Sequence, residues 1–301
     1  MDRLEAMSMF LAAIDQGSLS AAARHLRVPV ATLSRKVADL EALLGARLLT
    51  RTTRKLVPTD AGLAYAAAAR RILGELQEAE REAQGEFSKP SGDLVLTAPL
   101  MFGRLHVFPI LADFMSQFPE VNVRLVLGDR NLPLVEEHID IAVRIGALPD
   151  SSLMATRVGT MRTVTCGSPL LLKRYGLPQT PDEIGAIPCI LTDLQILSKG
   201  WRLRDPASGA PIFVPLAPRL VASAEPAVDA ALRGVGLVNL LLYQVHEALA
   251  AGKLIRVLEA YEPEPAPIHL VHAGHGQMPL KTRCFLDFAV PRLREAVAKI
   301  D

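Results

Sequence analysis

The chain has few cysteines and no long apolar segment. Only three of its 301 residues are cysteine, and Cys166, Cys189 and Cys284 form an odd, widely spaced set. This excludes a disulfide framework and a paired-cysteine metal site, and it favours a reducing compartment. No apolar run approaches the roughly 18–20 residues that span a bilayer, and residues 1–5 are too charged for a signal peptide. We therefore expect a cytoplasmic protein without a membrane partner.

The motifs of enzymes are also missing. No Ser or Cys lies in a nucleophile-elbow motif, and no glycine pattern matches a phosphate loop or a dinucleotide fingerprint. His269, His272 and His275 are the most suggestive metal-binding pattern. In a strand, however, His269 and His272 face opposite sides, whereas one metal ion needs converging ligands. Neither Cys166 nor Cys189 has a neighbouring cation in the sequence that would make its thiol reactive. We expect no enzyme activity, no metal and no cofactor.

Apolar sequence is plentiful, and positive charge is concentrated near the N-terminus. With 50% hydrophobic and 22% charged residues, the chain is long enough for two or three domains that each bury a core. Residues 1–60 hold nine Lys or Arg and six Asp or Glu, whereas residues 61–301 hold 24 and 26. Such clustering suits the neutralisation of phosphates. By itself a solvated charged face explains it more simply, so local structure has to decide.

Helical periodicity places this charge in a helix-turn-helix. Apolar residues recur at helical spacing over residues 4–14, and Ser18 is a typical cap for a short second helix. Pro29 suits the first turn of a third helix. In this geometry the helix after the turn enters the major groove, and its first residues meet base edges. The basic, β-branched residues 45–59 predict a strand-turn-strand wing beside the DNA backbone.

This N-terminal region resembles the LysR-type transcriptional regulators. The residues that carry the resemblance are Ala21-Ala22-Ala23-Arg24-His25-Leu26, Thr32-Leu33-Ser34-Arg35-Lys36-Val37, Leu40-Glu41, Leu44-Gly45, Leu48-Leu49-Thr50-Arg51 and Thr59-Asp60-Ala61-Gly62. Many members of the family have a serine cap where this chain has Pro29, so no cap or phosphate contact carries over there. The resemblance implies binding to double-stranded DNA through Thr32, Ser34, Arg35 and Lys36, with Arg51 and Arg54 in the wing.

Residues 59–88 predict one long helix with an alanine and leucine seam. Thirty helical residues would span about 45 Å, and so long a seam favours pairing with a second copy over an isolated, solvated helix. We predict a winged helix-turn-helix domain over residues 1–58 and a dimerising linker helix over residues 59–88. The family resemblance also implies tetramers, and RNA polymerase is a further candidate partner.

After residue 92 the pattern alternates between strands and helices. Strands are expected over residues 93–99, 121–127 and 139–144, a helix over 105–118 and a short helix over 132–137. Repeated strand-helix-strand units predict a mostly parallel sheet, whose ligands bind at the carboxyl ends of the strands.

Residues 89–301 resemble the family's effector-binding region, which has two α/β subdomains as in periplasmic binding proteins. The residues that carry this resemblance are Leu153-Met154-Ala155-Thr156-Arg157-Val158-Gly159, Ser168-Pro169, Arg174-Tyr175-Gly176, Gly234-Val235-Gly236-Leu237 and Ala251-Gly252-Lys253-Leu254. We place subdomain I at about 93–162 and 268–301, and subdomain II at about 163–267. The predicted fold class is thus α/β with an all-α N-terminal part.

The predicted effector site centres on Arg144, because a guanidinium binds a carboxylate in a two-pronged geometry. A structural ion pair explains Arg144 equally well. Apolar residues at the first strand end favour a carboxylate or an aromatic acid as effector, and Trp201 is a lid residue or, more simply, core. The predicted effector-binding residues are Pro99, Leu100, Met101, Phe102, Arg144, Gly146, Thr192, Ser223 and Asn239. We expect a sequence-specific DNA-binding regulator controlled by this small molecule; the alternative is a binding module or assembly protein without regulatory output.

Overall fold

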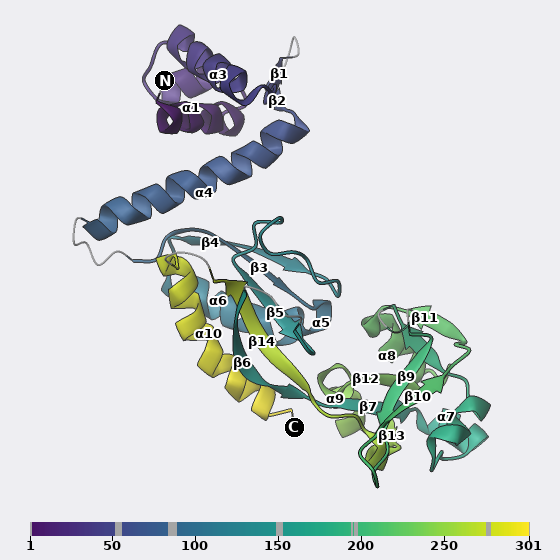
Figure 1. Ribbon diagram of the computed structural model, residues 1–301. Coiled ribbons are helices and arrows are strands. Elements are labelled where there is room, and N and C mark those ends of the chain that lie inside the picture. Colours follow the sequence, from purple (N-terminus) through teal and green to yellow (C-terminus); the bar gives the residue numbers. More distant parts are fainter. Residues whose placement is uncertain are drawn as a thin grey trace. The chain divides into compact units, whose positions relative to one another are not determined.

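The computed structural model describes residues 2–51, 56–83, 89–148, 153–193, 195, 198–274 and 278–300. The chain divides into two compact units, Met1–Gly92 and Asp93–Asp301 (Figure 1). Among the described residues, no helix has the length and apolar character needed to cross a membrane.

The first unit has three short helices, a two-stranded wing and a long helix. Its elements are α1 (Arg3–Asp15), α2 (Leu19–His25), α3 (Val30–Leu44), β1 (Leu49–Arg51), β2 (Leu56–Pro58) and α4 (Asp60–Ala83). Ser18 Oγ accepts a hydrogen bond from the Ala21 N–H at 3.0 Å and so caps α2, as predicted. Pro29 precedes α3 without a side-chain cap. Phe10 and Leu33, both fully buried, hold the helices on a common core.

The wing and the start of α4 are fastened together by short-range contacts. Thr59 Oγ1 donates to the Arg47 carbonyl at 2.7 Å and accepts from the Gly62 N–H at 3.0 Å. Glu41 Oε1 accepts from the backbone N–H groups of Leu48 and Leu49 at 2.7 and 3.0 Å. The predicted helix over residues 59–88 is therefore present from residue 60 to residue 83, and residues 84–88 lie outside the described residues.

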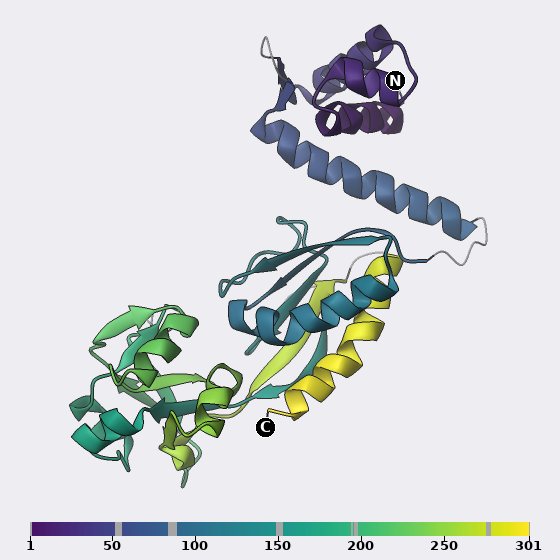
Figure 2. The same cartoon turned by 180° about the vertical axis from the view of Figure 1, so that it is seen from behind.

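Subdomain I is a five-stranded sheet in the order β4-β3-β5-β14-β6. Its elements are β3 (Gly92–Ala98), α5 (Leu100–Phe102), the π-helical turn η1 (Gly103–Val107), α6 (Phe108–Gln117), β4 (Val121–Leu127), β5 (Ile141–Ile145), β6 (Leu153–Met161), β14 (Ala266–Ala273) and α10 (Leu280–Ala298). Helices α6 and α10 cover one face of the sheet (Figure 2). β3 and β5 are parallel, but β14 is antiparallel to both β5 and β6. β3, β5 and β6 therefore run in the same direction, as the prediction of a mostly parallel sheet requires, and β14, on which the chain returns from subdomain II, runs against them.

Two local predictions in subdomain I were wrong. The first helical segment begins at Leu100, directly after β3, and not at Leu105. Residues 134–138 form turns where the short helix over residues 132–137 was predicted. Leu134 and Ile139 pack against the sheet face opposite α6 and α10, and this packing favours the turns over a regular helix.

Subdomain II contains several small sheets. Its elements are β7 (Thr163–Gly167), α7 (Pro169–Tyr175), the 3-10 turn η2 (Pro181–Ala186), β8 (Ile190–Thr192), β9 (Gly200–Arg204), β10 (Pro211–Pro215), β11 (Leu220–Ala222), α8 (Ala224–Leu232), β12 (Val238–Leu241), α9 (Leu242–Ala250), β13 (Ile255–Val257) and the 3-10 turn η3 (Glu259–Tyr261). β7 lies between β12 and β13 and is antiparallel to both, β8 pairs in parallel with β11, and β9 forms a hairpin with β10. The chain enters through Arg162, between β6 and β7, and leaves through residues 262–265, before β14. We call these two segments the first and second crossovers.

Candidate functional site

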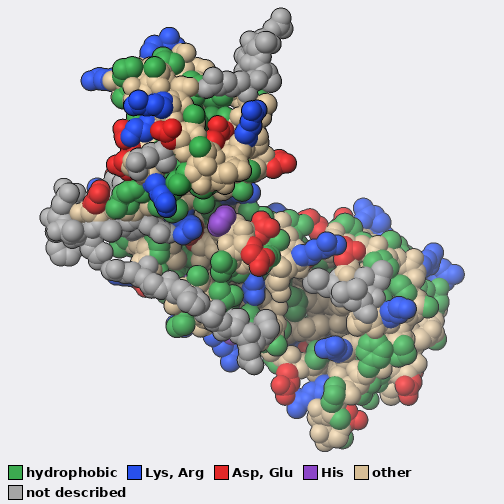
Figure 3. Space-filling model, turned by 45° about the horizontal axis from the view of Figure 1, so that its top comes forward, with side chains coloured by type: hydrophobic (Ala, Val, Ile, Leu, Met, Phe, Trp, Pro, Cys, Tyr) green, Lys and Arg blue, Asp and Glu red, His purple; other side chains and the backbone are tan. Residues whose placement is uncertain are grey.

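Of the DNA-binding residues predicted on helix α3, Arg35 has a solvent-exposed side chain. Leu33 and Val37 are buried against the rest of the unit, whereas Arg35 is exposed and Thr32 and Ser34 are half-buried. Lysine and arginine side chains are spread over the surface of this unit, with acidic ones between them (Figure 3). The amphipathic pattern of α3 thus places Arg35 where a DNA backbone or base edge is reachable.

Lys36, the next predicted contact, lies in a different environment. Its ammonium group forms an ion pair with the Glu5 carboxylate on α1, and its side chain is only 19% exposed. In the free protein Lys36 therefore fastens α3 to α1 and is not brought together with Arg35. For the wing, β1 contains Arg51, whose side chain is not described, and Arg54 lies outside the described residues.

This difference predicts unequal effects on DNA binding. Arg35→Ala should weaken operator binding and reduce the salt slope by about one, because it removes one phosphate or base contact. Lys36→Ala should change the slope less, since its charge is already paired with Glu5. Fluorescence anisotropy at several salt concentrations tests both. An unchanged slope in Arg35→Ala would show that Arg35 does not touch DNA.

A cavity of about 720 Å³ opens where both crossovers meet subdomain II. We call it the crossover cavity. It is lined by Thr163, Gln195, Ser198, Gly200, Trp201, Arg202, Asn239, Pro263, Glu264 and Ala266. Four of these ten residues have polar, uncharged side chains, and Arg202 and Glu264 supply one charge of each sign. Such a mixture suits a small organic molecule that carries a few polar groups.

Buried polar groups fix the wall of the crossover cavity. Asn239 is 4% exposed and donates from Nδ2 to Thr165 Oγ1 at 3.0 Å. Gln195 donates from Nε2 to the Asn239 carbonyl at 2.7 Å and accepts from the Thr192 N–H at 3.0 Å. Trp201 is 1% exposed, and its indole nitrogen is buried without a hydrogen-bond partner among the described residues. The cavity therefore has a rigid wall, and the Trp201 indole that lines it carries an unpaired N–H that is itself buried.

The predicted effector residues do not all converge on this cavity. Of the nine, Asn239 lines it. Gly146 lies close by, since its N–H donates to the Pro267 carbonyl at 2.9 Å, next to the cavity residue Ala266. Thr192 is held by Gln195, and Ser223 is the residue before α8.

The predicted effector residues after β3, residues 99–102, and Arg144 contact other parts of the protein and do not line the crossover cavity. Met101 and Phe102 are buried in the core of subdomain I, Pro99 is half-buried, and the Leu100 N–H donates to Asp129 Oδ1 at 3.1 Å. The Arg144 guanidinium donates to the Leu132 carbonyl at 3.0 Å. This hydrogen bond favours the structural explanation of Arg144 over that of an anion site.

Sequence reasoning did not identify most of the cavity wall. Thr163, Gln195, Arg202 and Glu264 come from four separate stretches of sequence, and nothing in their local sequence marks them as neighbours. Trp201 was considered only as a lid or as core. It packs with the core of subdomain II and also lines the cavity.

Besides the two crossovers, side-chain contacts near α5 also join the two subdomains. Arg104 Nη2 lies 3.0 Å from Glu225 Oε1, at the start of α8. The rings of Phe102 and His106 pack edge-on against Tyr243 of α9, with centroids 5.3 and 5.7 Å apart. Burial lowers the pKa of His106, so the imidazole favours its neutral form there. These contacts hold the two subdomains in one arrangement.

The remaining reactive side chains are poorly suited to chemistry. Burial raises the pKa of the thiols of Cys166 and Cys189 to about 12, although Arg256 opposes the shift at Cys166. A thiol that stays protonated is a weak nucleophile. Within the described residues, no group of three His, Cys, Asp or Glu side chains is placed to hold a metal ion, and His275 lies outside them.

Both units match known families. Residues 4–63 match the family model described as "Bacterial regulatory helix-turn-helix protein, lysR family", and residues 88–294 match "LysR substrate binding domain". An HTH-type transcriptional regulator of Xanthomonas campestris pv. campestris is 37% identical over 290 residues, 95% of this chain and 84% of that protein. The structure of CrgA from Neisseria meningitidis is 32% identical, with a TM-score of 0.61 over 96% of this chain and 98% of that chain. AphB of Vibrio cholerae is 25% identical, with a TM-score of 0.61 over 96% and 98%.

Proposed function

The chain belongs to the LysR family of transcriptional regulators, and from this premise we propose how it binds DNA and its effector. Members of this family bind DNA and small-molecule effectors, form oligomers and are not enzymes. We propose that Arg35 and the first turns of α3 contact operator DNA, and that the effector is a small acid bound in the crossover cavity.

Trp201 and Arg202, which both line the crossover cavity, carry the proposal for the effector. The indole N–H is buried without a partner among the described residues at a cost of about 1–3 kcal/mol, and a ligand oxygen would remove that cost if the wall moves to expose it. Arg202 is the cation that lines the same cavity, so it replaces Arg144 as the partner of a carboxylate. The indole supplies a flat apolar wall for the body of an aromatic or apolar acid.

Oligomerisation is proposed through α4. Its 24 residues carry the alanine and leucine seam that the sequence indicated, and a paired helix would set two copies of α3 on half-sites about one DNA turn apart. We propose a dimer through residues 59–88 that assembles further into a tetramer. Because DNA is the target, we also propose that the protein acts in the cytoplasm, where RNA polymerase is a candidate partner at the promoter.

Trp201→Phe tests the effector site. We expect the affinity for the effector to fall about tenfold, because the phenyl ring keeps the apolar wall but cannot donate a hydrogen bond. The free energy of unfolding should change by less than about 1.5 kcal/mol, as for other near-conservative apolar replacements in a core.

A thermal-shift screen of the full chain against carboxylates, aromatic acids and amino acids is expected to identify the effector. A ligand at 100 times its Kd adds about 2.7 kcal/mol, which raises Tm by several degrees. Titration calorimetry of the hit with the parent and with Trp201→Phe then compares the affinities. Equal affinities would remove Trp201 from the binding site.

A further inference from the structure

A second, smaller cavity lies at the junction of the subdomains. Its volume is about 300 Å³, at the lower end of the range for small-molecule sites. It is lined by Arg162, Leu242, His246, Leu249, Ala250, Arg256 and Ile300. We call it the α9 cavity, since four of these residues belong to α9. Arg162 lines the α9 cavity, whereas the next residue, Thr163, lines the crossover cavity. Successive side chains of an extended segment point to opposite sides, so these two neighbours line different cavities.

Two guanidinium groups meet at the wall of the α9 cavity because both bind Glu262. Arg162 donates from Nε and Nη2 to Glu262 Oε2 at 3.1 and 2.7 Å, and Arg256 donates from Nη2 to Glu262 Oε1 at 2.5 Å. The Glu262 side chain is only 9% exposed. The carboxylate thus fixes both cations and uses only one edge of each.

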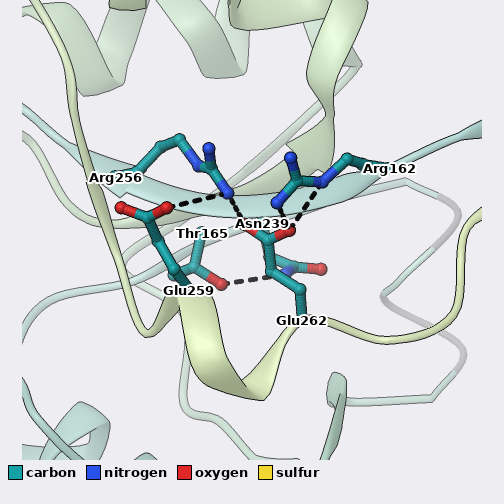
Figure 4. Close-up of polar contacts among 6 residues, drawn as sticks. All are labelled: Arg162, Thr165, Asn239, Arg256, Glu259 and Glu262. Atoms are coloured by element: carbon teal, nitrogen blue, oxygen red, sulfur yellow. Dashed lines mark hydrogen bonds and ion pairs between the residues drawn. The ribbon is translucent and has the colours of Figure 1, made fainter. Parts of the chain in front are cut away.

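The other edges of the two guanidinium groups remain available. In Figure 4, each arginine has a terminal nitrogen that no dashed line reaches, and both of these nitrogens point to the same side, away from Glu262. Among the described residues, Arg256 Nε also has no hydrogen-bond partner, but it is buried, so the terminal nitrogens are the donors that a ligand would meet. Charge-assisted hydrogen bonds from two such cations would stabilise a bound carboxylate.

The local charge favours an anion. Two arginines are matched in number by two glutamates, but Glu259 is 60% exposed whereas Arg162 and Arg256 are 37% and 22% exposed, so water screens that acid more than it screens the cations. His246, which is exposed, also lines the cavity. The rest of the wall is apolar and consists of Leu242, Leu249, Ala250 and Ile300.

We propose that the α9 cavity binds a small monocarboxylate with a short hydrocarbon chain. The carboxylate binds the free edges of Arg162 and Arg256, and the hydrocarbon chain packs against Leu242 and Leu249. This is a second ligand site. It shares no lining residue with the crossover cavity and does not depend on the effector proposed there.

Its position gives such a ligand a means of acting on the whole domain. Arg162 is the first crossover, Glu262 lies on the second, and Ile300 follows α10 of subdomain I. The Leu242 N–H at the start of α9 also donates to the Arg162 carbonyl at 2.8 Å. A ligand held by these groups contacts elements of both subdomains at the points where the chain passes between them, so it should bias their closure.

Calorimetry of the full chain with pentanoate tests the site. Pentanoate should bind the parent, and pentanamide, of the same shape without charge, should not. Ala250→Trp should weaken pentanoate binding at least about tenfold, because the indole fills the cavity from an exposed position without touching the ion pairs. The matched control is Ala251→Trp, one residue further on and also exposed, which should bind like the parent.

Glu262→Gln distinguishes a ligand site from a purely structural ion cluster. Removing the competing negative charge should tighten pentanoate binding about tenfold, even though the protein becomes less stable. No binding to the parent, equal binding of pentanamide, or equal affinities of the parent and Ala250→Trp would each overturn the proposal. Loss of pentanoate binding in Trp201→Phe would instead place the ligand in the crossover cavity, which also overturns it but leaves the proposed effector site intact.

Discussion

Gly62→Ala is expected to destabilise the N-terminal unit by about 3 kcal/mol and to abolish operator binding. A Cβ atom at this buried position would lie 2.0 Å from the Leu48 carbonyl oxygen. The obstacle is backbone, so the wing has to move away from α4, and overpacking of this kind costs about 1–3 kcal/mol or more. The same movement disturbs the Thr59 hydrogen bonds that join the wing to α4. Chemical denaturation and anisotropy with operator DNA measure the two effects.

Gly74→Ala is the matched control in the same helix. Gly74 is exposed, and nothing lies within 4 Å of a Cβ atom built there. Alanine should therefore stabilise α4 by about 0.5–1 kcal/mol through its higher helix propensity, with operator binding unchanged. If both variants behaved alike, the close contact between Gly62 and the wing would not exist in solution.

Glu262→Ala is expected to cost about 2 kcal/mol of the free energy of unfolding of the effector-binding domain. The change leaves the guanidinium groups of Arg162 and Arg256 without their shared carboxylate. Removing one partner of a fully buried ion pair costs about 3–5 kcal/mol. The cost is lower here because the two arginine side chains are 37% and 22% exposed. Urea denaturation of the full chain, followed by the fluorescence of Trp201, measures it.

Glu259→Ala provides the comparison, because Glu259 also pairs with Arg256, at 3.1 Å. Its side chain is 60% exposed, so its loss should change the free energy of unfolding by less than about 0.5 kcal/mol. Equal losses for the two variants would mean that burial does not set the strength of this cluster.

The N-terminal unit was predictable because its signals are local. Helical periodicity, the Ser18 cap and the basic strand-turn-strand segment lie within a few residues of the structure that they specify. The pairing of Lys36 with Glu5 was not predictable, since the two residues are 31 positions apart and either would make a normal solvated side chain. The charge pattern therefore directed attention to α3 but did not show which of its cations is already paired within the protein.

The effector-binding domain was predicted in outline, and its site was predicted poorly. The strand over residues 121–127 was found where its alternating pattern indicated. The antiparallel insertion of β14 between β5 and β6 depends on contacts across more than 100 residues, which periodicity does not encode. The rule that ligands bind at carboxyl strand ends directed attention to Met101 and Phe102, but the chain continues from β3 directly into α5, where both side chains are core.

Both cavities adjoin the crossovers, which suggests how ligand and DNA binding are coupled. A ligand shifts the closure of the subdomains only by the difference in its affinity for the two states. In a dimer joined through α4, closure would change the spacing of the two α3 helices, and couplings of this kind change affinity about 5- to 150-fold. The ion pair between Arg104 and Glu225 links the subdomains and should break or form with closure.

The most direct test is the affinity of the full chain for an operator selected from a random duplex library, measured against a scrambled duplex, with and without the acid identified by thermal shift. The account predicts that the operator binds at least about 1,000-fold more tightly than the scrambled duplex. It also predicts that the acid changes the operator affinity at least about fivefold. Equal affinities for the two duplexes, unaffected by the acid, would contradict a ligand-responsive, sequence-specific regulator.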